Sequence, residues 1–157
     1  GLQLPPGQVG VLTAMKTDSD VCFAGLASAA PTLFRPETLV AGQMPQFAEA
    51  TSTAQRELFA LIIEKTRLLS DGVWFGTPHN LGLEWDSGAL AARMGEMTHE
   101  HLVLFGKMDY WIPRDHMDVM VQKLPNARLE VFPYVGHSMN LEQPLLFARI
   151  FGDYFHS

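Results

Sequence analysis

Near the end of the chain, the hydrophobic pattern alternates between short runs typical of strands and longer runs with helical spacing. Residues 101–105 and 128–132 are the short runs, and residues 114–124 and 143–155 have the helical spacing. Parallel strands joined by helical crossovers are the simplest arrangement of this β-α-β-α order, so it predicts an α/β fold. The first short run is apolar on both faces, as expected where helices cover both sides of a parallel sheet.

One helix and one further strand are predicted near the start of the chain. Residues 7–16 form a mostly apolar segment that ends at the polar turn 17–20, which predicts a helix packed on both sides. The apolar residues 21–28 are predicted to form a buried strand that stops at Pro31, because proline ends the ladder of strand hydrogen bonds. Three strands are therefore expected in the chain.

The middle of the chain, residues 32–100, combines helical patterns with Pro and Gly breaks and has no good strand, which indicates a helical insertion. Its best helix is expected to begin at Ser52, whose hydroxyl can cap the first turn while Gln55 reaches back, and to end at Asp71-Gly72. A second, shorter helix is expected to begin after Asp86.

Two polar loops follow the C-terminal strands, at the sheet edge where ligands of open α/β sheets bind. Asp109 lies in the first loop and His137 in the second. A carboxylate that fixes the tautomer of an imidazole, which then acts as a general base, is the second half of a nucleophile-base-acid triad. Either residue alone fits a turn or a helix cap, but the two in successive strand-end loops favour catalysis.

The segments "LVLFGKMDYWIP" and "NARLEVFPYVGHSMNLEQPLLFARIFGDYF" resemble the acid-bearing segment, the histidine loop and the closing helix of the α/β-hydrolase superfamily. "VCFAGLASAAP" is similar to the strand that precedes the cap in such proteins. The resemblance implies that Asp109 is the triad acid and His137 the base. It also implies three regions: residues 1–31 as the core helix and strand after the nucleophile elbow, 32–100 as a helical lid, and 101–157 as the C-terminal core.

The nucleophile elbow Gly-x-Ser-x-Gly of this superfamily does not occur in the chain. The best alignment places Gln3 at the nucleophile position and the backbone N–H of Leu4 in the oxyanion hole. A primary amide is not a useful nucleophile, and Pro5-Pro6 replaces the small residues of the elbow. Three explanations stay open: the nucleophile lies on a separate N-terminal chain, Gln3 replaces it in a non-hydrolytic protein, or the alignment is out of register.

The resemblance implies that this chain supplies only part of a parallel sheet. A three-stranded parallel sheet with an uncovered apolar edge would associate or aggregate. We therefore expect a companion that supplies the other strands and the second oxyanion-hole N–H. An N-terminal fragment of the same precursor is the simplest candidate, and another companion chain is the alternative.

The composition of the chain argues against some kinds of binding partner and bears on the cellular compartment. The chain has 157 residues, of which 47% are hydrophobic and 18% charged, as is typical of one globular domain. Its net charge of −6 and the absence of a basic cluster argue against nucleic-acid and anionic-membrane partners. The apolar runs fall short of the roughly 20 residues that span a membrane, and the start has no signal-peptide pattern, so we expect a cytoplasmic protein.

No cofactor or metal is expected. The chain contains no glycine-rich phosphate-binding motif. Its single cysteine, Cys22, falls in the predicted buried strand and is expected to be an inert hydrophobe. The run His99-Glu100-His101 offers two histidines without a third ligand.

Apolar side chains are abundant in the lid region, and some of them are expected to line a pocket for an uncharged, hydrophobic substrate. Trp111 and Met139, each two residues beyond Asp109 and His137, are the expected pocket walls. The resemblance implies hydrolysis of an ester, lactone, amide or activated carbon-carbon bond by nucleophile-His-Asp catalysis. The alternative is a binding module or a cyclase-like enzyme on the same scaffold.

Overall fold

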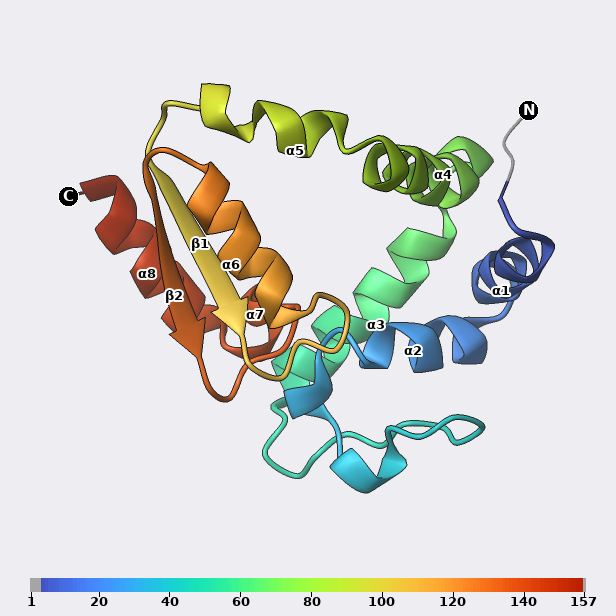
Figure 1. Cartoon of the computed structure of the whole chain (residues 1–157). Coiled ribbons are helices and arrows are strands. Elements are labelled where there is room, and N and C mark those ends of the chain that lie inside the picture. The colour runs from blue at the N-terminus through green and yellow to red at the C-terminus, as the bar shows by residue number, and fades with distance from the viewer. Residues whose placement is uncertain (1–3, 157) are drawn as a thin grey trace.

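The computed structural model describes residues 4–156, which form helices and one pair of strands (Figure 1). The helices are α1 (Pro6–Thr17), α2 (Ser19–Ala27), α3 (Thr53–Arg67), α4 (Asp71–Ser87), α5 (Ala89–Arg93), α6 (Arg114–Lys123), α7 (Met139–Glu142) and α8 (Pro144–His156). Short 3₁₀ turns are η1 (Pro31–Leu33), η2 (Pro36–Thr38) and η3 (Met94–Glu96), and the strands are β1 (His101–Gly106) and β2 (Ala127–Phe132). Within residues 4–156, every helix is too short or too polar to cross a membrane.

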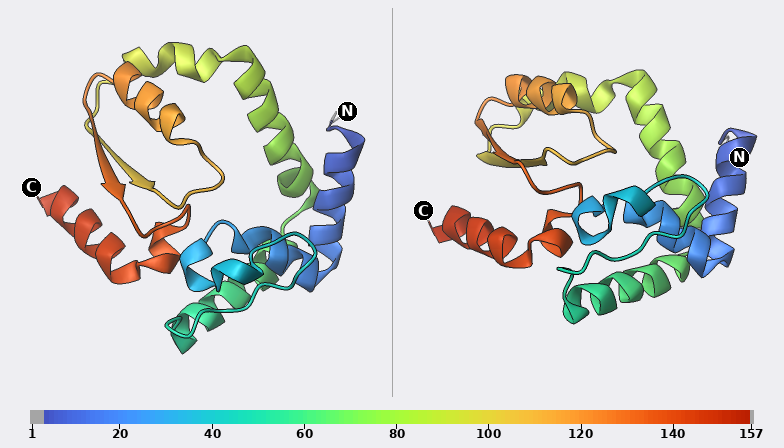
Figure 2. Two further views of the ribbon diagram at one scale, coloured as in Figure 1. Left: turned by 60° about the horizontal axis from the view of Figure 1, so that its bottom comes forward. Right: turned by 90° about the horizontal axis from the view of Figure 1, so that it is seen from below.

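The two strands are parallel neighbours, as the C-terminal pattern predicts. Their register pairs His101 with Ala127 and Gly106 with Phe132. Helix α6 connects them and packs against the pair, and α8 lies on the opposite side (Figures 1 and 2). The predicted α/β class is therefore confirmed, with both strands ending at one edge.

The strand predicted at residues 21–28 is wrong, because these residues form α2. The Asp18 carboxylate accepts hydrogen bonds from the backbone N–H groups of Asp20 (2.8 Å) and Val21 (3.3 Å) and so caps a helix. An apolar run of this length does not distinguish a buried strand from a buried helix, and this one contains a single β-branched residue. The described part of the chain therefore has two strands rather than three.

Helix α2 packs against α1 and α3 around an aromatic core. Four rings contact one another there, with centroids 4.7–6.0 Å apart: Phe23, Phe34, Phe47 and Phe59. Cys22 is fully buried in this core, and burial raises the pKa of its thiol, partly opposed by the charge of Arg67. None of the residues of α1 is buried, so the expectation that it packs on both sides is wrong.

Residues 32–100 are mainly helical, and the first α-helix of this region begins where predicted. Ser52 Oγ accepts the backbone N–H of Gln55 (3.2 Å), and Gln55 Oε1 accepts the backbone N–H of Ser52 (3.1 Å), which completes a capping box for α3. The predicted end of this helix at Asp71-Gly72 is wrong: α3 ends at Arg67, and Asp71-Gly72 is the start of α4. Gly88 ends α4 with a φ of 62°, so the expected start after Asp86 is wrong.

Candidate active site

The loops after β1 and β2 bring Asp109 and His137 together. His137 Nδ1 lies 2.9 Å from Asp109 Oδ2. An ionised carboxylate can only accept hydrogen bonds, so Nδ1–H is the donor and Nε2 of the neutral imidazole is left basic. Among residues 4–156, Nε2 has no hydrogen-bond partner. The Asp109 side chain is 7% exposed and that of His137 39%, so a buried carboxylate orients an accessible imidazole.

The carboxylate of Asp109 is held by its own loop. Its Oδ1 accepts the backbone N–H groups of Trp111 (2.8 Å) and Ile112 (3.0 Å), which directs Oδ2 toward His137. The backbone N–H of Asp109 donates to the carbonyl of Gly106 (3.0 Å). Both carboxylate oxygens are thus occupied, and the side chain has one fixed orientation.

A glycine at the end of β1 allows the two loops to touch. A Cβ on Gly106 would lie 2.1 Å from the carbonyl oxygen of Val135 and 2.4 Å from that of Gly136. The backbone N–H of Met108 donates to the same Val135 carbonyl (3.0 Å). Sequence reasoning missed this role of Gly106, although its position three residues before Asp109 was the available signal.

Trp111 links the pair to the end of α2. Its ring lies nearly parallel to the imidazole of His137, with centroids 5.1 Å apart and an interplanar angle of 29°. Its Nε1–H donates to Ser28 Oγ (2.9 Å), whose hydroxyl donates to the carbonyl of Gly25 (3.2 Å). Trp111 was expected near the site and lies there, whereas Ser28 was not expected. The substrate-binding role of Trp111 stays a prediction.

The structure does not test the roles of the remaining expected site residues. Met139 begins α7 and is 7% exposed, so its role as a pocket wall stays a prediction. Gln3 lies outside the described residues. Leu4 directly precedes Pro5 and α1. Its oxyanion role stays a prediction.

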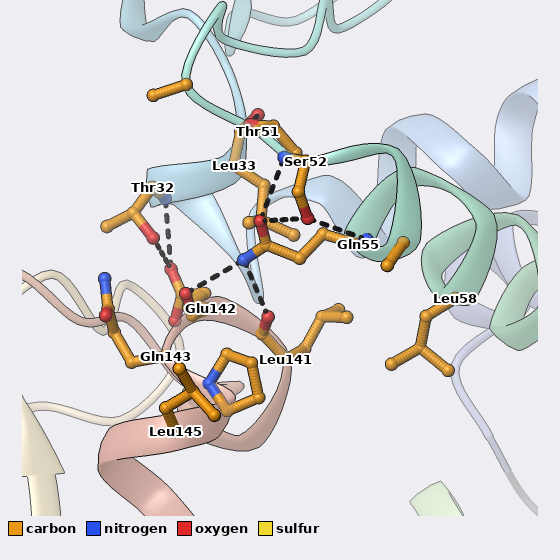
Figure 3. A pocket seen from close by; sticks show the side chains of 13 residues that line it. Thr32, Leu33, Thr51, Ser52, Gln55, Leu58, Leu141, Glu142, Gln143 and Leu145 are labelled. Atoms are coloured by element: carbon orange, nitrogen blue, oxygen red, sulfur yellow. Dashed lines mark hydrogen bonds between the residues drawn. The ribbon is translucent and has the colours of Figure 1, made fainter.

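A cavity of about 640 Å³ lies between η1, the start of α3 and the junction of α7 and α8 (Figure 3). Gln55 Nε2 donates there to the carbonyls of Leu141 (3.2 Å) and Glu142 (3.1 Å). Neither Asp109 nor His137 lines this cavity. In the described part of the chain, no three His, Cys, Asp or Glu side chains are grouped so that they could hold a metal ion.

No family model matches the chain. It is 36% identical over 72 residues to a 2-hydroxy-6-oxononadienedioate/2-hydroxy-6-oxononatrienedioate hydrolase of Comamonas testosteroni, which covers 46% of this chain and 25% of the relative. It is also 36% identical over 62 residues to a pimeloyl-[acyl-carrier protein] methyl ester esterase of Nitrosomonas europaea, which covers 40% and 25% of the two chains. The matches thus span about a quarter of the length of these curated relatives.

A solved structure shares the fold along nearly the whole chain. An α/β-hydrolase enzyme from a Medee basin deep-sea metagenome library superposes with a TM-score of 0.54 at 13% identity, over 99% of this chain and 53% of that one. Likeness at this identity shows the fold alone. Together with the sequence relatives, it confirms the resemblance predicted from the motifs. The chain has the fold of the α/β-hydrolase superfamily, and it corresponds to about half the length of that solved structure.

Proposed function

We propose that this chain supplies the acid and the base of a hydrolase of the α/β-hydrolase type. The observation that carries the proposal is the 2.9 Å contact between Asp109 and His137, which leaves Nε2 basic and accessible. Such a nitrogen can take a proton from an attacking nucleophile and return it to a leaving group. The hydrolase names of the sequence relatives support the same reaction class.

The proposed nucleophile is a serine outside the described residues. No nucleophilic side chain is bonded to His137 Nε2 among residues 4–156, and the amide of Gln3 cannot attack a carbonyl. We place the serine on an N-terminal segment of the same precursor. That segment would also supply the oxyanion hole, because one of its N–H groups belongs to the residue directly after the nucleophile. The assignment of Leu4 to this role holds only in the alternative in which position 3 is the nucleophile position.

In the proposed mechanism, the serine oxygen attacks the substrate carbonyl carbon while its proton passes to His137 Nε2. Asp109 stabilises the imidazolium that forms and keeps its Nδ1–H directed at Oδ2. Collapse of the tetrahedral intermediate breaks the bond to the leaving group, which takes the proton from Nε2. Water then attacks the acyl-enzyme with Nε2 as base again, which releases the acid product and restores the serine.

The proposed substrate is a hydrophobic small molecule with an ester, lactone, amide or activated carbon-carbon bond. The ring of Trp111, 44% exposed and stacked on His137, offers an apolar surface next to the base. The methyl ester named for the esterase relative contains one of these bonds, whereas the dienedioate named for the other relative is a dicarboxylate and is not a hydrophobic molecule.

We further propose that the same N-terminal segment completes the sheet. A two-stranded sheet is marginal by itself, and the similar solved chain is about twice as long as this one. An apolar groove of about 610 Å³ follows β1 and is available for a covering element. Its apolar lining includes Leu90, Met94, Met97, Leu104, Met117 and Met120. A native mass of 17.4 kDa for the stable, active species would contradict this part of the proposal.

A non-hydrolytic protein on the same scaffold is the second candidate, and the glutamine at position 3 favours it. Turnover by the complete native protein separates the two candidates. The compounds to be assayed are a p-nitrophenyl ester, an acyl lactone, an anilide and a 2-hydroxy-6-oxo-dienoate. Hydrolysis of at least one of them supports the proposal, whereas an intact protein that hydrolyses none of them favours the second candidate.

Two histidine variants then test the assigned base. We expect His137→Ala to lower kcat by roughly 10⁴-fold or more while the circular dichroism spectrum is kept. The control is His99→Ala, which removes an exposed histidine before β1 and is expected to leave turnover unchanged. Turnover near the wild-type rate in His137→Ala would refute the assignment.

A further inference from the structure

We propose that Glu142 is a positioning residue that holds His137 in its working orientation, an inference that rests on the proposed function. Glu142 is the last residue of α7 and is 3% exposed. Burial of a carboxylate is costly unless its oxygens are hydrogen-bonded. No ion pair joins Glu142 to a basic side chain among the described residues, so its hydrogen bonds carry the whole compensation.

The Glu142 carboxylate joins the histidine loop to the segment after α2. Its Oε2 accepts the backbone N–H of Gly136 (2.7 Å), the residue directly before His137. Its Oε1 accepts both the backbone N–H (3.0 Å) and the hydroxyl (2.7 Å) of Thr32 (Figure 3). Hydrogen bonds to a carboxylate are about twice as strong as neutral ones. One buried side chain thus bridges two loops that are far apart in the sequence.

The residue after His137 is anchored to the same segment. The backbone N–H of Ser138 donates to the carbonyl of Ala29 (2.8 Å). A Cβ on Gly136 would lie 2.3 Å from Pro31 Cδ, so the loop is in direct contact with this proline. Both neighbours of His137 are therefore tied to residues 29–32, one directly and one through Glu142.

This double attachment bears on catalysis because base catalysis depends on geometry. A misplacement of a catalytic group by about 1 Å can cost about 100-fold in rate. The Nδ1–Oδ2 contact holds the imidazole at one ring atom. The attachments of the neighbouring residues hold the backbone of His137, and so the position of its Cα, in place. Gln55 of α3 also donates to the backbone carbonyl of Glu142 (3.1 Å), so the first lid helix contacts the same residue.

The Glu142 carboxylate accepts three hydrogen bonds, which makes Glu142→Gln a sharp test. Glutamine has the same shape but one acceptor oxygen, and the backbone N–H groups of Gly136 and Thr32 face opposite oxygens of the carboxylate. One of these N–H groups must therefore face the amide NH₂ of the variant. In the complete native protein, we expect kcat to fall by about 10- to 100-fold with KM within about twofold.

The matched control is Glu57→Gln on α3, which removes the same charge from an exposed residue and is expected to keep wild-type kcat. Thr32→Val removes only the hydroxyl donor and is expected to lower kcat by about 3- to 10-fold. Thr32→Ser keeps both the backbone N–H and the hydroxyl donor and is expected to have wild-type kcat. The two threonine variants keep the proposal testable if Glu142→Gln does not fold.

Nuclear magnetic resonance separates positioning from general stability. In Glu142→Gln we expect the ring nitrogen signals of His137 to shift, and amide exchange at Gly136 to accelerate by at least about tenfold. A lower Tm with unchanged His137 signals and unchanged kcat well below Tm would overturn the proposal. If the wild-type protein hydrolyses nothing, the proposed function fails, and the His137 signals and Gly136 exchange still decide whether Glu142 positions the loop.

Discussion

His137 Nδ1 and Asp109 Oδ2 lie 2.9 Å apart although the two residues are 28 positions apart in the sequence. The topology explains this contact, because β1 and β2 are parallel neighbours that end at the same edge. Gly106 then lets the loop after β1 lie against the loop after β2. The pairing of the strands and the close approach of the two loops at Gly106 thus place Asp109 and His137 side by side.

The role of Asp109 is tested by Asp109→Asn. An asparagine can present its NH₂ to the imidazole, which favours the tautomer with the proton on Nε2 and removes the base. We expect kcat to fall by about 10³- to 10⁴-fold with little change in the fold. The matched control is Asp118→Asn on α6, where the carboxylate contacts only Arg114 among the described residues. A kcat within threefold of wild type in Asp109→Asn would argue against the triad.

The hydrogen bond between Trp111 and Ser28 is tested by a double-mutant cycle. Trp111→Phe keeps an aromatic ring beside His137 but removes the Nε1–H donor, and Ser28→Ala removes the acceptor. We expect each variant to lower the free energy of unfolding by about 0.5–1.5 kcal/mol. The double variant should lose less than the sum of the two, since the pair shares one bond. Strict additivity in urea unfolding would contradict a direct link.

Gly106 is predicted to be the most sensitive glycine of the site. In Gly106→Ala the new Cβ meets two backbone carbonyls, so we expect a loss of about 3 kcal/mol or more in the free energy of unfolding. The control is Gly152→Ala in α8, where a Cβ meets nothing within 4 Å and a gain of about 0.5–1 kcal/mol is expected. Equal stability of the two variants would show that the loops can separate at little cost.

The sequence predicts the C-terminal part of the site well because its signals are local. Each short apolar run is followed by a polar loop and a helix, and these patterns identify β1, β2 and the positions of Asp109 and His137. The region before Pro31 is predicted less well. Its apolar residues fit a buried strand and a buried helix equally, and the cap at Asp18 decides for the helix.

Long-range partners account for what the sequence does not reveal about the site. Thr32 and Glu142 are 110 residues apart, and Ser28 and Trp111 are 83 apart. No spacing or motif connects such residues, because their contacts depend on how the segments before β1 pack against the loops at the strand ends. The hydrogen bonds of the buried Glu142 carboxylate can therefore be identified only from the three-dimensional structure.

The buried thiol of Cys22 gives a prediction for alkaline pH. Burial raises the folded-state pKa of this thiol above its ordinary value of 9.0, so the folded protein keeps the proton longer than the unfolded chain. Its contribution to stability is fully present below pH 9.0 and is lost as the pH rises through the higher folded-state pKa. We expect the free energy of unfolding to fall more steeply above pH 9.0 in the wild type than in Cys22→Ala. Parallel curves would contradict this.

The most direct test of the central claim is mass spectrometry of the complete native protein after treatment with a fluorophosphonate probe. This probe reacts with a serine that a histidine activates. We predict one adduct, on a serine outside residues 4–156, and labelling at least about 100-fold slower in His137→Ala. No adduct on the wild-type protein, or equal labelling of both proteins, would contradict the claim that His137 and Asp109 activate a serine nucleophile.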